Sequence, residues 1–168
     1  MNYLKIDKYD IANGIGIGAV LWVAGCSCRC HGCHNPQTWD FGAGQSFTDN
    51  TMQELLMSLD KPYVSRLTLS GGHPLESRNA PEILKIVKRV KTELPNKCIW
   101  IYTGYVWEQI ITTDLLPEIL KYTDVLVDGP YVEGMRDISL SFRGSSNQRV
   151  ILVKRSLEEG EIVLWQEK

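Results

Sequence analysis

The segment GAVLWVAGCSCRCHGCHNP, residues 18–36, joins a short apolar run to a group of closely spaced cysteines. Residues 18–25 are almost wholly apolar and are bounded by glycines, a pattern that predicts a buried strand. Four cysteines and two histidines follow at the carboxyl end of that strand: Cys26, Cys28, Cys30, His31, Cys33 and His34. Because α/β sheets bind their ligands outside the carboxyl ends of the strands, this segment predicts both a parallel sheet and the position of a site.

Strand-like and helix-like segments alternate along the rest of the chain. Further short apolar runs predict strands at residues 66–72, 98–105 and 125–129. Apolar residues at helical spacing predict helices at residues 48–60, 79–94 (with Asn79 as its cap) and, in part, 115–124. The last two apolar runs, 148–153 and 161–166, flank a turn at 158–160 and predict a C-terminal hairpin.

This alternation predicts an α/β fold with right-handed crossovers between parallel strands. A complete eight-fold barrel needs about 250 residues, and the chain has 168. We therefore expect a partial, open TIM-like barrel with a mostly parallel, curved sheet. Three predicted strand ends would meet at its rim: the cysteine segment, SGGHP at residues 70–74 and YTGY at residues 102–105.

Composition narrows the possible functions. The chain is 43% hydrophobic and 23% charged, as in ordinary globular proteins, and its formal net charge of −2 argues against nucleic acid as a partner. The first ten residues lack a signal peptide pattern, and no apolar run is long enough to span a membrane. We therefore expect a cytoplasmic protein, in which clustered cysteines bind metal or act in catalysis rather than form disulfides.

The cysteine spacing allows several chemistries. A single zinc ion usually takes ligand pairs from two separated segments, so four thiols within eight residues would strain the backbone, although a site closed by the distant His73 is possible. Residues 30–34 also match the C-x-x-C-H haem attachment signature, which belongs outside the cytosol. A redox pair of Cys30 and Cys33 would leave Cys26 and Cys28 without a role.

A fourth interpretation uses three of the thiols. The spacing Cys26-x3-Cys30-x2-Cys33 forms a compact loop that can present three thiolates to a [4Fe–4S] cluster. The fourth iron would then lack a protein ligand and could bind a substrate or cofactor. In this interpretation Cys28 occupies an unconstrained position, although a role as an alternative ligand or as a radical-conducting thiol stays open.

This spacing resembles the signature of the radical S-adenosylmethionine (SAM) superfamily. Five segments in order resemble, more specifically, the activating proteins of anaerobic ribonucleotide reductases: residues 20–39, 67–77, 99–108, 125–131 and 142–150. They include GCSCRCHGCHNPQTW, SGG and RGSSNQR, and they cover most of the chain. The resemblance implies a single radical SAM domain at residues 1–168, and it implies that Cys26, Cys30 and Cys33 bind the cluster.

The resemblance also implies a reaction. A reduced [4Fe–4S] cluster would cleave SAM to methionine and a 5′-deoxyadenosyl radical, which takes a hydrogen atom from a glycine of the partner reductase. The partners implied are an anaerobic ribonucleotide reductase and an electron donor such as flavodoxin. Two other functions stay open from the residues: another radical SAM enzyme, acting on a small molecule or on a different glycyl-radical enzyme, and a structural zinc-binding module.

By the same resemblance, SAM would lie along several strand-end loops. The backbone of Gly32, Cys33, His34 and Asn35 would follow the adenine. Gly71 and Gly72 would lie beside the methionine amino group, because glycine permits close approach of a ligand to the backbone. Thr103, at the end of the next strand, is a further expected SAM contact.

Three other side chains have no settled role in the sequence. Family members commonly carry an acidic residue after the two glycines, and this chain has His73, whose ring or carbonyl could accept a hydrogen bond from the SAM amine. Arg143 and Arg149 flank the segment GSSNQ and could clamp an anion, either the SAM carboxylate or an acidic group of a partner. They could equally be exposed surface charges.

Overall fold

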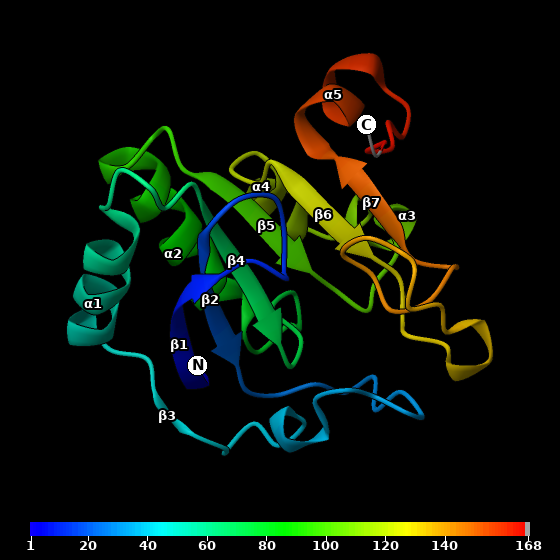
Figure 1. Cartoon of the computed structure of the whole chain (residues 1–168), viewed down its shortest axis with the longest axis horizontal. Helices are drawn as coiled ribbons and strands as arrows, with labels where there is room; N and C mark the ends of the chain where they lie inside the picture. The colour runs from blue at the N-terminus through cyan, green and yellow to red at the C-terminus, as the bar shows by residue number, and fades with distance from the viewer. Residues whose placement is uncertain (167–168) are drawn as a thin grey trace.

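In the computed structural model, which describes residues 1–166, seven strands form one sheet in the order β3-β1-β2-β4-β5-β6-β7 (Figure 1). The strands are β1 (Asn2–Asp10), β2 (Gly18–Val23), β3 (Gln45–Ser46), β4 (Arg66–Gly71), β5 (Cys98–Tyr102), β6 (Val125–Asp128) and β7 (Arg149–Leu152). Strands β2, β4, β5 and β6 run parallel, whereas β1, β3 and β7 pair antiparallel at the two sides. The sheet is therefore mostly parallel at its centre, as expected, and it does not close.

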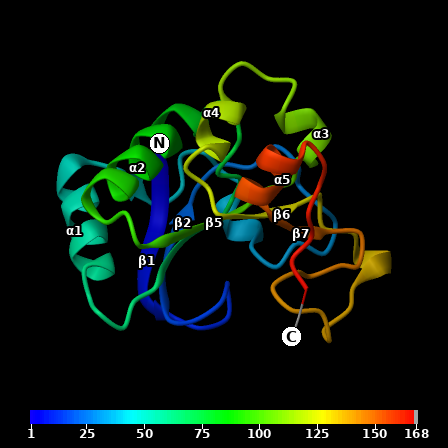
Figure 2. The ribbon, with the colours of Figure 1, turned by 90° about the horizontal axis from the view of Figure 1, so that it is seen from above.

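Helices α1 (Asp49–Leu59), α2 (Ala80–Glu93) and α4 (Leu116–Leu120) lie on one side of the strands (Figure 2). Their buried faces pack with alternate strand residues such as Leu21, Leu69 and Ile101 in one apolar cluster. This alternation arises because successive strand side chains point to opposite faces of a sheet. The remaining helical segments are short: α3 (Trp107–Ile110), α5 (Val153–Glu159), and the 3₁₀ turns η1 (Pro36–Thr38) and η2 (Glu133–Met135).

The opposite face of the sheet carries a smaller apolar cluster together with polar side chains. Trp100, Val127 and Val150 pack there against Phe142 and Trp165. Beside this cluster, β4 presents Arg66, Thr68 and Ser70, all buried. The helix-covered face is apolar, whereas this face carries buried polar side chains that could serve a functional site.

Arg66 organises the polar face, although its side chain is fully buried. Its guanidinium donates to Asp10 Oδ1 at 2.6 Å and to Thr68 Oγ1 at 2.6 Å. The glycine-rich loop of residues 11–17 wraps around it, and a Cβ at Gly14 or Gly18 would approach the Arg66 side chain to 2.9 Å or less. Gly14 and Gly18 of NGIGIG therefore make room for a buried arginine.

Two expectations about the ends of the chain were incomplete or wrong. Strand β1 was not foreseen, because its residues show weak alternation and only Tyr3 among them is buried. The predicted C-terminal hairpin is wrong: α5 replaces the first half of the connection, and Gly160 ends it with a φ of 72°. The returning chain meets β7 only through an isolated antiparallel bridge between Ile151 and Leu164.

Replacing Arg66 with methionine should destabilise the protein by about 3 kcal/mol, because it leaves the Asp10 carboxylate without its buried partner. Urea unfolding followed by circular dichroism measures this change. Arg89→Met is the matched control: Arg89 pairs with Glu93 on an exposed helix face, so it should cost less than about 1 kcal/mol. Equal losses in the two variants would contradict the structural role of Arg66.

The contribution of this pair should also depend on pH. Burial opposes ionisation of Asp10, but the hydrogen bonds from Arg66 and Asn13 outweigh it and lower the pKa of Asp10 below 3.8. A carboxyl group with a depressed folded-state pKa stabilises the fold above its unfolded-state pKa and loses that contribution as the pH falls through the folded value. The stability difference between the parent and Arg66→Met should therefore shrink below pH 4, as unfolding curves at several pH values would show.

Candidate metal centre

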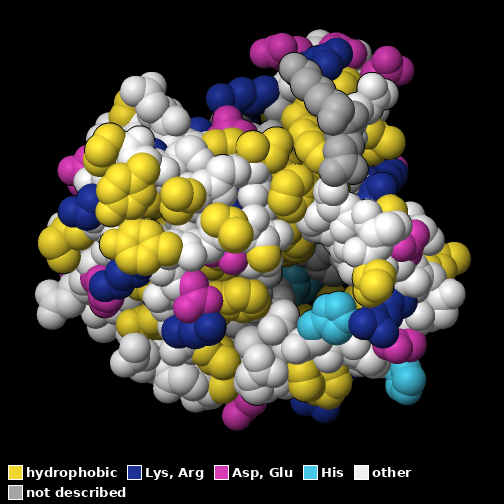
Figure 3. Space-filling view, viewed as in Figure 1, with side chains coloured by type: hydrophobic (Ala, Val, Ile, Leu, Met, Phe, Trp, Pro, Cys, Tyr) yellow, Lys and Arg dark blue, Asp and Glu magenta, His cyan; other side chains and the backbone are white. Residues whose placement is uncertain are grey.

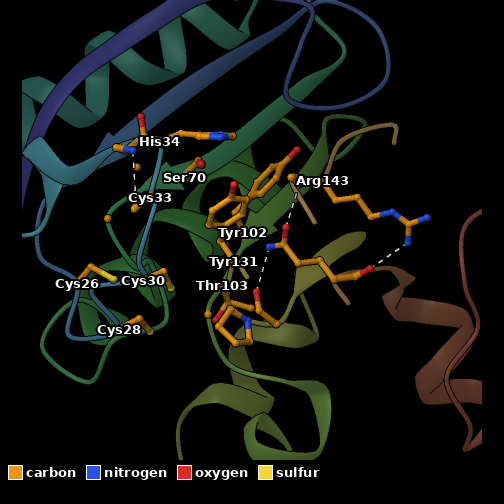
Figure 4. Close-up of a pocket in the computed structure, with 18 of the residues that line it drawn as sticks. Cys26, Cys28, Cys30, Cys33, His34, Ser70, Tyr102, Thr103, Tyr131 and Arg143 are labelled. Carbon is orange, nitrogen blue, oxygen red and sulfur yellow. Dashed lines mark hydrogen bonds between the residues drawn. The ribbon is translucent and has the colours of Figure 1, made fainter. Parts of the chain in front are cut away.

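A pocket of about 390 Å³ lies at the carboxyl ends of the parallel strands. The loops after β2, β4, β5 and β6 all line it, which confirms that the cysteine segment, SGGHP and YTGY converge. Figure 3 shows a hollow on this face of the molecule with histidine side chains at its edge. Figure 4 shows the four clustered cysteines on one side of the pocket, with Arg143 on the other.

Backbone hydrogen bonds fix the base of the cysteine loop. The amides of Gly25 and Cys26 donate to the carbonyls of Thr38 and Trp39, at 2.7 and 3.1 Å. Gly25 has a φ of 94°, and a Cβ there would meet the ring of Phe41 at 2.1 Å. The glycine before the first cysteine is therefore required by the chain's own packing.

The side chain of Asn79 joins the cysteine loop to the turn after β4. Its amide nitrogen donates to the carbonyl oxygens of Ala24 and His73, both at 3.0 Å, and to that of Gly25 at 3.4 Å. The sequence predicted Asn79 as the cap of α2, and Asn79 does occupy the N-cap position, but its side chain makes no capping bond. Its buried amide instead fixes the position of two site loops relative to each other.

The clustered cysteines have the chemistry of an iron–sulfur site. Cys26, Cys28, Cys30 and Cys33 are free thiols, each partly buried, and all line the pocket. A hydrogen bond from Cys28 lowers the pKa of Cys26 to about 6, so Cys26 is a thiolate at neutral pH. Burial raises the pKa of Cys30. Since thiolates are the usual ligands of iron–sulfur clusters, this donor set fits a [4Fe–4S] group.

Cys28 and His73 contact each other, which the sequence did not predict. Cys28 Sγ lies 3.8 Å from His73 Nδ1, and His73 Nε2 lies 2.7 Å from Thr103 Oγ1. The carbonyl of His73 also has partners, because it accepts from Glu76 N and from Asn79. The ring and the carbonyl of His73, which were both expected to be able to accept a hydrogen bond from SAM, thus have partners within the chain. Burial lowers the pKa of His73 to about 4, so its ring is neutral at pH 7.

The expected adenine segment is only partly exposed to the pocket. Cys33, His34 and Asn35 line the pocket, and the Asn35 amide donates to Cys33 Sγ at 3.4 Å. Gly32 lies outside the lining and adopts a φ of 72°, where a Cβ would collide with the Glu133 carboxylate. The left-handed backbone at position 32 thus favours glycine by itself.

Gly71 and Gly72 line the pocket, but the chain itself explains why both are glycine. Gly71 has a φ of 100°, and its Cβ would lie 2.9 Å from the Val23 carbonyl oxygen. A Cβ at Gly72 would lie 2.7 Å from the carbonyl oxygen of Gly25. A side chain at Gly71 would therefore meet the backbone of β2, and one at Gly72 would meet the base of the cysteine loop, whether or not a cofactor is bound.

The two arginines near GSSNQ differ in their surroundings. Arg149 pairs with the fully buried Asp128 of β6 and with Glu108 of α3 at 2.9 Å, and these contacts hold β7 against both elements. Arg143 lines the pocket, and its guanidinium donates to the Gln148 carbonyl at 2.9 Å and extends away from the cysteines (Figure 4). Arg149 is thus structural, and Arg143 does not reach the cysteines.

Trp39 is a site residue that sequence reasoning missed. It lines the pocket, and its buried Nε1 has no hydrogen-bond partner among the described residues. A buried donor without a partner is rare in folded proteins and is satisfied when a ligand accepts from it. The sequence alone could not show that the indole nitrogen of Trp39 would be buried beside the pocket without a partner.

Comparison with known proteins shows an iron–sulfur protein family. Residues 12–151 match the family model of the 4Fe–4S single cluster domain, so the chain belongs to that family. Curated relatives narrow this further. A protein of Enterobacteria phage T4 is 45% identical over 89% of this chain and 93% of its own length. Proteins of Pasteurella multocida and Escherichia coli K12 are 42% and 40% identical, over 88% and 89% of this chain and 95% and 97% of theirs.

All three relatives carry the name anaerobic ribonucleoside-triphosphate reductase-activating protein, and the chain belongs to their family. The resemblance drawn from the sequence motifs is therefore confirmed. Within the described residues, no helix has the length and apolar character needed to cross a membrane.

Single alanine replacements should divide the clustered cysteines into two groups. Cys26→Ala, Cys30→Ala and Cys33→Ala should each lose the iron bound after anaerobic reconstitution, because each removes a thiolate from a three-ligand site. Cys28→Ala should retain it. Iron and acid-labile sulfide are measured per chain, with Cys98→Ala as a control outside the loop. A Cys28→Ala protein without iron would overturn this assignment.

Asn79→Leu should weaken the site and the fold together. Leucine has the same branched skeleton of heavy atoms as asparagine but cannot donate, so the Ala24 carbonyl would stay buried without a partner, at a cost of about 1–3 kcal/mol. Urea unfolding measures the loss, and iron content after reconstitution should fall with it. Asn96→Leu, at an exposed position, is the control; unchanged stability and iron in Asn79→Leu would refute the role of this amide.

Proposed function

We propose that this protein activates an anaerobic ribonucleotide reductase by reductive cleavage of SAM at a [4Fe–4S] cluster, generating a glycyl radical on the reductase. The observation that carries the proposal is the convergence of four free thiols on one pocket at the carboxyl edge of the sheet. The names of the relatives supply the reaction partner. Because the chain matches a 4Fe–4S family, we do not propose that it functions as a structural zinc module.

In this proposal, Cys26, Cys30 and Cys33 hold the cluster and leave one iron without a protein ligand. The group supplies, when bound, the single electron that breaks the sulfonium bond of SAM. The chain binds and orients the cofactor and shields it from water, as proteins do for such groups. The low pKa of Cys26 favours its thiolate form before any iron arrives.

We place SAM in the part of the pocket beyond the cysteines. Cys33, His34 and Asn35 offer backbone groups for the adenine, and Gly72 and Thr103 border the methionine end. Trp39 Nε1 is a donor available to an acceptor atom of the cofactor, and Arg143 Nε, also buried without a partner among the described residues, is another. Gly32, Gly71 and His73 stay assigned to this region; Gly71 lines the pocket directly, and His73 borders it through its contact with Cys28.

The architecture suits a protein substrate. We regard the fold as a partial TIM-like barrel, with helices on one side of an open sheet and the site at its carboxyl edge, forming a single radical SAM domain over residues 1–168. An open side admits a loop of a large partner, which a closed barrel would exclude. We further propose a cytoplasmic setting and a flavodoxin-like electron donor.

The reconstituted protein with SAM and dithionite, or with a flavodoxin system, should produce a persistent radical on its cognate anaerobic reductase. Electron paramagnetic resonance should show a doublet, because the unpaired electron couples to the α-hydrogen of the glycine.

The matched control is the same reductase with that glycine replaced by alanine. The signal should disappear while complex formation, measured by sedimentation, stays close to that of the parent. Productive SAM cleavage that yields a small-molecule product, with no radical on the reductase, would refute the proposal and favour a different radical SAM enzyme.

A further inference from the structure

Cys28 and His73, which the proposed function leaves without a chemical role, form a compact donor group with Cys26. The Sγ atoms of the two cysteines and a ring nitrogen of His73 all lie within 4.8 Å of one another. The cysteines come from the loop after β2, whereas His73 comes from the turn after β4. Sequence spacing singles out Cys26, Cys30 and Cys33, but the closest donor group among the described residues is this one.

The separation of Cys28 Sγ from His73 Nδ1 matches that of two ligands of a single tetrahedral ion, and the whole group lies within 4.8 Å. Zinc binds sulfur at about 2.3 Å and imidazole nitrogen at about 2.0–2.1 Å, so ligand atoms on a tetrahedron lie about 3.5–3.8 Å apart. Cys28 Sγ and His73 Nδ1 are already 3.8 Å apart. A cluster separates its thiolates more widely, because each of them binds a different iron. The group is therefore arranged for one ion rather than for a cluster.

His73 is oriented as a metal ligand would be. Its ring is 1% exposed and packs edge-on against Tyr105, with ring centroids 4.3 Å apart. With the ring proton on Nε2, that nitrogen donates to Thr103 Oγ1 at 2.7 Å, and the Nδ1 lone pair is left toward Cys28. Metal-bound histidines almost always donate their other ring N–H to such a partner, which fixes the tautomer and the ring.

Cys28 is also seated by its surroundings. A Cβ at Gly104 would lie 2.6 Å from Cys28 Sγ, so the sulfur occupies space that only a glycine leaves free. The Glu76 carboxylate lies 3.8 Å from His73 Nδ1 and accepts from the Ser27 amide at 3.2 Å. It adds negative charge beside the group and can supply a fourth ligand, as a water molecule also can.

We propose that Cys26, Cys28 and His73 form a second, mononuclear site for a thiophilic divalent cation such as Zn²⁺. Occupation of this site excludes the [4Fe–4S] cluster, because both need Cys26. The exclusion rests on the proposed function, whereas the cation site itself does not. Zinc bound here is thus a competitor of cluster assembly and not a structural element of the fold.

The test titrates Co²⁺ and Zn²⁺ into the cluster-free full-length chain, under anaerobic conditions with a phosphine reductant. One Co²⁺ per chain should bind and give the intense visible bands of a tetrahedral site with thiolate-to-metal charge transfer, and Zn²⁺ should displace it. Cys28→Ala should weaken binding at least about 10-fold, the lower limit for losing even a residue that only orients a ligand. Thr103→Val should weaken it by about 10- to 100-fold, since His73 loses its partner.

Matched variants distinguish the two cysteine groups. Cys30→Ala and Cys33→Ala should bind Co²⁺ as the parent does, whereas Cys26→Ala should not. If Cys30→Ala and Cys33→Ala lose Co²⁺ while Cys28→Ala retains it, the cation uses the motif cysteines and the proposal is overturned. No tetrahedral Co²⁺ spectrum in the parent overturns it as well. Circular dichroism of each variant verifies that it is folded.

A second measurement tests the exclusion. One equivalent of Zn²⁺ should slow iron incorporation into the parent and leave incorporation into Cys28→Ala unchanged. Equal slowing in both proteins would overturn the exclusion. A parent that binds Co²⁺ but never assembles a cluster would instead refute the proposed function and leave the cation site standing.

Discussion

The site depends on the buried amide of Asn79, which donates to the carbonyls of Ala24, Gly25 and His73. These carbonyls belong to two loops that follow neighbouring parallel strands, β2 and β4. The same two loops are also joined by the hydrogen bonds from His73 N to the Gly25 carbonyl and from Ser27 N to the Glu76 carboxylate. The donors that face the pocket are therefore positioned largely by side chains that do not line it, with Asn79 making the most contacts.

The central sheet could be predicted from sequence because each buried strand is a short apolar run ending in a turn or loop. The ends of the chain could not. Strand β1 exposes residues on both faces, so it lacks the alternation that identifies a half-buried strand. In the C-terminal region, the two apolar runs gave a hairpin pattern, but Val153 and Ser156 are buried at helical spacing and form α5. Short segments of this kind are decided by tertiary packing rather than by local pattern.

The location of the site could be predicted from sequence, but the neighbours of its residues could not. Motif spacing and the strand-end rule brought the cysteines, SGGHP and YTGY together. The glycines suggested room for a cofactor, and the structure adds a second reason for them: a Cβ at Gly32 or Gly72 would meet Glu133 or the Gly25 backbone. Likewise, nothing in a linear spacing places His73 against Cys28, because the contact exists only once β2 and β4 pair. Asn79 at the start of α2 has the pattern of a cap, and only its burial shows its other partners.

The central claim is that three thiolates hold a cluster and leave one iron open. Mössbauer spectroscopy of the parent, reconstituted anaerobically with ⁵⁷Fe, tests it most directly when spectra are recorded with and without SAM. Three ligands predict that one iron of the four changes its isomer shift when SAM binds, while the other three do not. If no iron responds in the parent but one responds in Cys28→Ala, Cys28 is a fourth ligand and the three-thiolate account is contradicted.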